Sequence, residues 1–408
     1  MIKNKKSSLL IIFLTVFIDL LGFGIIIPIV PFFLEEYFIS PEHAGKILGL
    51  LMTAFSLMQF IFAPILGRLS DKIGRRPIIL ISLLGSAATH FMFALAPNLA
   101  VLFIARIFTG IFGATVPTAM AYIADITSRE NRARGMGLIG MAFGLGFVFG
   151  PAIGGVLSHY GLRIPIFAAG ILSLASFILA WFRLGESRTQ SSPKYTTSRN
   201  FAFTNLVKAL KHPNLGYLFV IFFLVTLSFT SLETIFAYFV ERKFSLNSVK
   251  TGLLFGYIGF ISASIQGGLI GPLSKKFGEI KLIVFATLLL TITFFALPFV
   301  GSFLSFMIVL GILSIAIGLH NPSVLSLISK NASVDEQGGI LGINQSFSSL
   351  ARIIGPFWAG YFFDHFGIEI PFWASSILLL TAFSFTFILF RKNLHQSTKS
   401  QEEVNHES

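Results

Sequence analysis

The sequence contains no cysteine and few charged residues. The absence of cysteine excludes disulfides, thiolate metal sites and cysteine nucleophiles. Only 12% of the residues are charged whereas 54% are hydrophobic, and the mean hydropathy of +0.82 is far above that of a soluble domain. We therefore expect the 408-residue chain to be a membrane protein.

Long apolar runs recur from Leu9 to Phe390, and each is close to the roughly 20 residues that a helix needs to cross a bilayer. A transmembrane barrel is not expected, because its strands would alternate apolar and polar residues. The first run is interpreted as a helix and not as a secretory signal, because it carries Asp19 and shows no small-residue cleavage site. The prediction is an all-α membrane protein with twelve transmembrane helices, at residues 9–33, 44–66, 78–96, 99–121, 135–158, 164–184, 214–240, 249–270, 282–300, 303–327, 338–362 and 370–390.

The basic residues are distributed unevenly between the loops. If the amino terminus lies inside, the tails and the even-numbered loops hold 23 of the 30 Lys and Arg residues. The opposite side holds only Lys46, Arg163, Arg242, Lys243 and Lys250. Since positively charged loops remain in the cytoplasm, this bias places both termini there. It also accounts for the net charge of +12 without nucleic acid as a partner.

The two halves of the sequence share one pattern of glycine and proline when they are shifted by 204 or 205 residues. The features in register are Gly67–Gly74 with Gly271–Gly278, Gly113 with Gly318, Pro117 with Pro322, Gly137 with Gly342, and Gly150–Pro151 with Gly355–Pro356. The shift is half the chain length, so we predict a six-helix unit used twice. The predicted domains are helical bundles at 1–184 and 214–392, joined by a cytoplasmic linker at 185–213 and followed by a cytoplasmic tail at 393–408.

A charged segment, Gly67-Arg-Leu-Ser-Asp-Lys-Ile-Gly-Arg-Arg-Pro77, separates the second and third spans. It resembles the loop between helices two and three of the major facilitator superfamily, whose fold consists of two pseudo-symmetric six-helix bundles with substrate bound between them. The resemblance implies that Asp71 accepts from the start of a helix in the other half, that Arg75 pairs with Asp125, and that these contacts latch the cytoplasmic side. The second copy has Lys275 where the first has Asp71, so the acidic latch is assigned to the first half only.

The predicted gating residues are Gly67, Asp71, Gly74, Arg75, Arg76 and Asp125. The two glycines would allow the backbone to turn tightly against a neighbouring helix. The alternative is that the basic residues of this segment only fix the topology.

The fifth span carries Gly146-Phe-Val-Phe-Gly150-Pro-Ala-Ile-Gly154-Gly155. This run resembles the helix of family exporters that exchange substrate for protons, and the direction of transport rests mainly on it. Ordinary helix packing, which also requires small residues four apart, is the alternative. The residues assigned to this antiporter motif are Gly146, Gly150, Pro151, Gly154 and Gly155.

The wider pattern is similar to the tetracycline and multidrug exporters, in Asp19–Pro28, Ala105–Gly110 and Ala121–Asp125. It departs from them at His90, where tetracycline exporters carry an acid. A chelate of tetracycline with a metal ion is therefore not the expected substrate.

Only two acids, Asp19 and Glu233, lie well inside spans. Asp19 lies about 15 Å into the membrane at 1.5 Å per residue, where an ionisable group costs at least roughly 2.5–3.5 kcal/mol. A carboxyl in this position can load and release a proton as its surroundings change. Arg106 is the cation of the same half, and it matches the helix-four arginine that the family associates with proton coupling. A static ion pair between Asp19 and Arg106 is the alternative.

In the second half, Glu233 is expected to bind a cationic substrate, carry protons or cap an irregular stretch of backbone. Arg352 is expected to hold an anionic group or to pair with Glu233. The four residues predicted to couple protons and bind substrate are Asp19, Arg106, Glu233 and Arg352.

These observations predict a proton-coupled secondary active transporter, working by alternating access as an efflux antiporter for small hydrophobic or amphipathic compounds. The alternatives are a proton-coupled importer or exporter of a specific metabolite or siderophore, and a non-transporting membrane receptor. An enzyme is not expected, because there is no cysteine, no Walker loop and no cluster of metal ligands within a span. We expect no cofactor, and the proton gradient is the expected energy source. The expected partners are a small-molecule substrate, protons and membrane lipid. We expect the protein to be a monomer and to lie in the bacterial cytoplasmic (inner) membrane.

Overall fold

The computed structural model describes residues 5–40, 43–113, 115–127, 129–187, 215–331 and 337–407. Within these ranges almost every residue is helical and no strand occurs, so the predicted all-α class is confirmed. Most of the predicted linker, residues 188–213, lies outside the described residues.

The first half forms α1 (Lys5–Ile26), α2 (Val30–Tyr37), α3 (Ala44–Ile73), α4 (Arg75–Ala94), α5 (Leu99–Phe112), α6 (Thr115–Ile126), α7 (Arg129–Ser158) and α8 (Arg163–Arg183). The second half forms α10 (Leu215–Phe244), α11 (Ser248–Ser264), a π-helical turn (Ile265–Leu269), α12 (Ile270–Phe277), α13 (Glu279–Ala296), α14 (Phe303–Lys330), α15 (Gln337–Phe366) and α16 (Ile370–Glu407).

Eleven of the described helical stretches are long and apolar enough to cross a membrane. α15 has 30 residues and covers the predicted eleventh span, and its more polar sequence includes Asn344, Gln345 and Arg352. The prediction of one helix at 9–33 was wrong. Pro28 has no N–H to donate, so α1 ends at Ile26 and a separate helix α2 begins at Val30.

The internal repeat is visible in the backbone. Gly74 (φ +109°) and Gly278 (φ +78°) occupy equivalent positions between α3 and α4 and between α12 and α13. A side chain would strain the backbone at such angles, which explains why both copies have glycine there. The helices α5 and α14, which follow α4 and α13, also begin alike. In each, the side chain of the N-cap residue, Asn98 or Ser302, accepts from the backbone N–H three residues later.

The chain divides into two compact units that do not coincide with the two sequence halves. The first unit contains Met1–Thr197, Glu233–Gly259 and Pro356–His365, and the second contains Ser198–Leu232, Phe260–Gly355 and Phe366–Ser408. One end each of α10, α11 and α15 therefore packs within the first unit, although these helices belong to the second half of the sequence.

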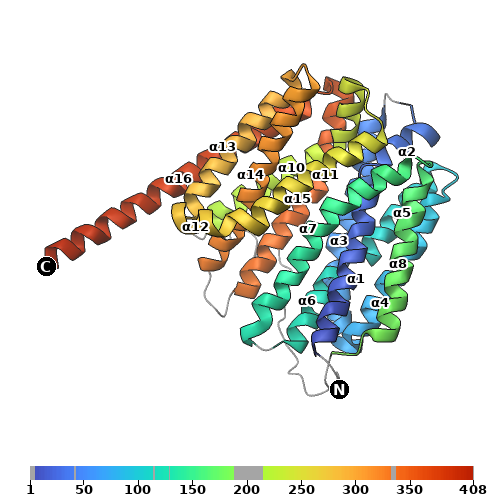
Figure 1. Cartoon of the computed structure of the whole chain (residues 1–408), viewed down its shortest axis with the longest axis horizontal. Helices are drawn as coiled ribbons and strands as arrows, with labels where there is room; N and C mark the ends of the chain where they lie inside the picture. The colour runs from blue at the N-terminus through green and yellow to red at the C-terminus, as the bar shows by residue number, and fades with distance from the viewer. Residues whose placement is uncertain are drawn as a thin grey trace. The chain divides into compact units, whose positions relative to one another are not determined.

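Each unit has its own apolar core. In the first, α1 lies between α7 and α8 (Figure 1), and α4 packs against α5 and α8. The buried residues of this core include Ile12, Val16, Leu83, Tyr122 and Ile139. In the second unit, α13 packs against α14 and α16. Its core includes Leu218, Phe219, Ile283, Val324 and Phe347.

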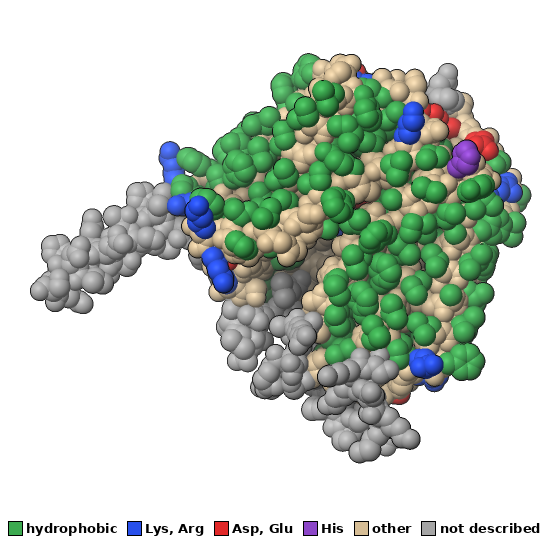
Figure 2. Space-filling view, viewed as in Figure 1, with side chains coloured by type: hydrophobic (Ala, Val, Ile, Leu, Met, Phe, Trp, Pro, Cys, Tyr) green, Lys and Arg blue, Asp and Glu red, His purple; other side chains and the backbone are tan. Residues whose placement is uncertain are grey.

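Large apolar side chains also cover the outside of the helices, as the face drawn in Figure 2 shows. Phe182, Phe260 and Leu304 are among the most exposed. Such a surface would make a water-soluble protein aggregate, whereas it suits contact with lipid chains. The exposed side chains thus agree with the membrane assignment made from hydropathy.

Candidate functional site

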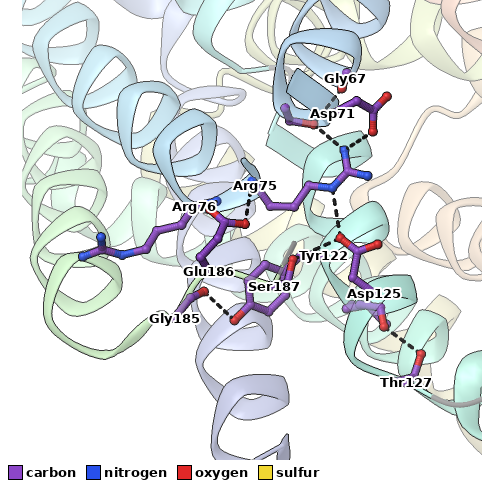
Figure 3. Close-up of polar contacts among 12 residues, drawn as sticks. Gly67, Asp71, Arg75, Arg76, Tyr122, Asp125, Thr127, Gly185, Glu186 and Ser187 are labelled. Carbon is purple, nitrogen blue, oxygen red and sulfur yellow. Dashed lines mark hydrogen bonds and ion pairs between the residues drawn. The ribbon is translucent and has the colours of Figure 1, made fainter. Parts of the chain in front are cut away.

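The charged segment Gly67–Pro77 lies where α3 ends and α4 begins, at what we call the near end of the first unit (Figure 3). Arg75 is the centre of its contacts. Its Nη1 lies 2.6 Å from Asp71 Oδ1, and its Nε lies 3.1 Å from Asp125 Oδ2. The expected pair between Arg75 and Asp125 is therefore present, and it ties the end of α6 to the turn between α3 and α4. The predicted contact of Asp71 with a helix of the other half stays a prediction.

A residue that the sequence reasoning missed completes this network. Glu186 follows α8, and its two carboxylate oxygens accept from the backbone N–H groups of Arg75 at 2.9 Å and Arg76 at 3.1 Å. Gly74, the residue before α4, has no side chain to cap the helix, and a Cβ there would overlap Glu186. A carboxylate at this position satisfies unpaired amides and complements the helix dipole.

The remaining side chains at the near end are also held. Arg76 donates to the carbonyl oxygen of Trp181 at 2.6 Å and lies 5.6 Å from the centre of its ring. Ser187 donates to Asp125 Oδ2 at 3.1 Å, and Tyr122 donates to the carbonyl oxygen of Gly185 at 2.9 Å (Figure 3). Through Arg75 and Arg76 this turn is thus joined to the ends of α3, α4, α6 and α8.

The glycines of the antiporter motif bring α7 into backbone contact with α1. A Cβ added at Gly150 would lie 2.7 Å from Gly24 Cα, and one at Gly146 would lie 3.0 Å from Leu20 Cβ. A Cβ at Gly154 would overlap a carbonyl group of α1. Such close approach of two helices is what ordinary helix packing, the alternative given for this motif, requires; its role as an antiporter signature stays a prediction.

The same motif contacts a second helix, α11, through its remaining members. A Cβ at Gly155 would lie 2.9 Å from Gly252 Cα, and one at Gly252 would lie 2.5 Å from the carbonyl oxygen of Pro151. One turn further, the hydroxyls of Ser158 and Ser248 are hydrogen-bonded at 2.8 Å. The motif therefore links α1 of the first sequence half to α11 of the second within one unit.

Asp19 lies in α1, one residue before Leu20, which touches α7. Its carboxyl group interacts with the side chain of Thr115 in α6, whose hydroxyl donates to the carbonyl oxygen of Phe112 at 3.4 Å. In the described part of the chain, no ion pair joins Asp19 to Arg106. The static ion pair that was the alternative to a proton-coupling role is thus absent between these two described residues.

Arg106 is held by aromatic rings instead. It is 3% exposed, and its guanidinium lies 4.8 Å from the ring centre of Phe93 and 5.9 Å from that of Phe55. The ring faces attract the cation, although its buried Nε has no hydrogen-bond partner in the structure. His90 is also buried, and its Nδ1 lies 3.5 Å from Ser173 Oγ.

The two predicted site residues of the second sequence half fall in different units. Glu233 in α10 belongs to the first unit and Arg352 in α15 to the second. The pairing proposed for them from the sequence stays a prediction.

A second charged cluster lies at the far end of the first unit, where α3 begins, and the sequence reasoning did not select it. Arg242 of α10 places its Nη2 3.9 Å from Glu35 Oε1 of α2, and its guanidinium lies 4.6 Å from the ring centre of Phe363. Burial raises the pKa of Glu35 to about 7, with Glu241 raising it further and Arg242 opposing the shift. The hydroxyl of Tyr238 donates to the carbonyl oxygen of Pro31 at 3.2 Å.

Among the described side chains, no three His, Asp or Glu residues lie together as a metal site would require. The charged groups described above for the first unit include the near-end network, the carboxyl of Asp19 within α1, the buried Arg106, and the far-end cluster.

Comparison with known proteins gives a consistent result. The sequence profile of a family described as Major Facilitator Superfamily matches residues 12–356 and 264–407. The chain is 29% identical over 391 residues to multidrug resistance protein 2 of Bacillus subtilis (strain 168), covering 95% of this chain and 96% of that one. It is 35% identical over 354 residues to the class G tetracycline resistance protein of Vibrio anguillarum, covering 86% and 89%.

Solved structures are similar over nearly the whole chain. The human organic anion transporter MFSD10 superposes with a TM-score of 0.71 at 25% identity, covering 94% of this chain and 99% of that one. A bacterial homolog of the human lysosomal transporter Spinster, in an inward-facing and unoccupied conformation, gives a TM-score of 0.78 at 17% identity over 97% and 98%. The latter supports the fold alone.

Proposed function

The chain belongs to the Major Facilitator Superfamily, and we propose that it is a proton-coupled exporter of small hydrophobic or amphipathic compounds. Relatives named multidrug resistance and tetracycline resistance proteins support export. We further propose that it works as a monomer in the bacterial inner membrane. The near end and both termini would face the cytoplasm, in keeping with the distribution of Lys and Arg.

The observation that carries the proposal is the position of Asp19. Its carboxyl lies within the span of α1, beside the neutral side chain of Thr115 and not paired with Arg106. A carboxyl held in this way can bind a proton in apolar surroundings and release it when water or a cation approaches. Arg106, which is buried against aromatic rings and lies in the same sequence half, is our candidate for that cation.

The glycine contacts would transmit movement of α1, which carries Asp19, to α7 and α11. The segment of α1 that follows Asp19 meets α7 backbone to backbone at Gly24 and Gly150, and α7 meets α11 at Gly155 and Gly252. Tightly packed helices move together because an interface without side chains between the backbones cannot deform gradually. A change around Asp19 would therefore shift α7 and α11 as well.

The near-end network would act as the cytoplasmic latch. Arg75, shared by Asp71 and Asp125, holds three helix ends through charge-assisted hydrogen bonds. Alternating access requires that such contacts form in one state and break in the other.

The test uses inside-out vesicles with an acidified lumen and a panel of fluorescent dyes and drugs. We expect the dyes to accumulate only when the pH gradient is present. Asp19→Asn should abolish this accumulation and retain dye binding, whereas Glu36→Gln, an exposed carboxyl changed in the same way, should leave both intact. Undiminished accumulation by Asp19→Asn would remove Asp19 from proton coupling, and gradient-driven movement out of the vesicles would indicate an importer.

A further inference from the structure

The start of α3 at the far end is capped by a residue more than 300 positions away. Asp364 Oδ1 accepts from the backbone N–H of Gly45 at 3.0 Å, and Asp364 Oδ2 accepts from that of Lys46 at 2.7 Å. These are the second and third residues of the helix, whose amides an N-cap side chain usually serves. His43, the residue before α3, makes no such bond.

The carboxylate reaches these amides because α3 and α15 touch through backbone. A Cβ at Gly45 would lie 2.9 Å from the carbonyl oxygen of Gly360 and 2.7 Å from Asp364 Oδ1. One turn along, a Cβ at Gly49 would overlap the carbonyl group of Pro356. The close contact therefore depends on the glycines of α3, and at its end the Asp364 carboxylate of α15 binds the first turn of α3.

We propose that Asp364 is a gating residue of the far side, whose carboxylate holds α15 against the first turn of α3 and must release these amides before substrate can leave there. The proposal rests on the transport function proposed above, since a gate has meaning only in a transporter. It assigns an acidic latch to the second sequence half, at the end of the molecule opposite to Asp71.

The chemistry suits a latch better than a permanent joint. A carboxylate that receives two amide hydrogen bonds at a helix start gains from both the bonds and the helix dipole, yet a single side chain can let go and be hydrated instead. The equivalent contact in the other copy lacks this charge. Counting back 205 residues from Asp364 leads to His159, which is exposed, and α7 and α11 are joined nearby by the neutral hydroxyls of Ser158 and Ser248.

The groups around the latch tie the end of α15 to α10. On α10, Arg242 lies over Phe363, the neighbour of Asp364, and points to Glu35. Tyr238 packs with its ring centre 5.7 Å from that of Phe363. Releasing Asp364 from the α3 amides would thus leave the contacts of α15 with α10 in place.

The experiment exploits the absence of cysteine from the chain. Ala44→Cys places one thiol at the fully buried first residue of α3, and Tyr160→Cys places one at an exposed far-end position. Labelling with a membrane-impermeant maleimide is measured for each thiol in intact cells and in inside-out vesicles. Modification of Tyr160→Cys only in intact cells would place the far end outside, independently of any substrate.

We expect Asp364→Ala to speed labelling of Ala44→Cys by about 2- to 30-fold, the range that corresponds to loss of a helix cap. Labelling of Tyr160→Cys should not change, and Asp364→Asn, which has the same shape but no charge, should give a smaller increase. His159→Ala serves as the matched control without effect.

A labelling rate of Ala44→Cys that stays the same in both Asp364 variants, in protein still inserted in the membrane, would overturn the gate. Equal acceleration at both thiols would also overturn it, because it would indicate general loosening. Since labelling needs no substrate, these results remain distinct from failure of dye transport, which would count against the proposed function.

Discussion

The crossing of α1 and α7 offers a sharp test of the helix packing. Gly150 faces α1 so closely that a Cβ would lie 2.7 Å from Gly24 Cα, 2.9 Å from Gly24 C and 3.0 Å from Ile25 N. All three are backbone atoms, which cannot rotate away as a flexible side chain could. The change Gly150→Ala must therefore push the two helices apart by several tenths of an ångström or more.

The magnitude follows from two opposing effects. Overpacking of a tight interface costs about 1–3 kcal/mol, whereas replacing glycine by alanine inside a helix gains up to about 1 kcal/mol. A change at Gly144 allows the two effects to be measured separately. Gly144 lies in the same helix and is exposed, and among the described residues a Cβ there would have no atom of another helix within 4 Å. Gly144→Ala should thus stabilise the protein slightly, and Gly150→Ala should lower its free energy of unfolding.

Thermal unfolding of the purified protein in detergent provides the assay. Relative to Gly144→Ala, which has the same gain in helix propensity, the overpacking loss of about 1–3 kcal/mol corresponds to a Tm lower by roughly 2–12 °C for a unit of this size. Equal Tm values for the Gly150→Ala and Gly144→Ala proteins would refute the close crossing, and with it the route from Asp19 to α7.

Two further predictions concern carboxylates at the ends of helices. Glu186→Ala removes the acceptor of two amides of α4 and should cost about 0.5–2 kcal/mol of stability, measured as a lower Tm than in the Glu36→Gln control. Glu35 has its pKa raised from 4.5 to about 7, mainly by burial, so its contribution to stability is fully present below pH 4.5 and is lost as the pH rises through about 7. We expect Tm to decrease between pH 5 and 8 in the unmodified protein and to decrease less in Glu35→Gln, and identical pH profiles would contradict this origin.

Much of the fold could be predicted because lipid makes the sequence signal strong. Each span needs a long apolar run, and the runs are separated by short charged segments that are easy to recognise. The repeat could be predicted because positions such as Gly74 and Gly278 need glycine for their backbone angles, and this requirement is local. The break between α1 and α2 was missed because an apolar run shows where a helix can lie but Pro28 decides where it ends.

The candidate site was predictable only where a short motif contained both partners or pointed to them. Arg75 and Asp125 could be paired through the resemblance to a known loop. Glu186 was missed because it follows the last span of its half and looks like the start of a linker. No local pattern connects Asp364 with Gly45, which are brought together only by the packing of α3 and α15.

The two missed acids nevertheless share a feature that local sequence does show. α4 is preceded by Gly74 and α3 by His43, and neither residue caps its helix with a side chain. A helix that starts without its own cap leaves amides that must find an acceptor elsewhere, and within a membrane protein few free acceptors exist. At α4 and α3 the acceptor comes from a distant element, through Glu186 and Asp364 respectively, so these two uncapped starts become joints between elements. In each of these two joints one carboxylate serves two amides, so removing that group should leave both amides without their acceptor.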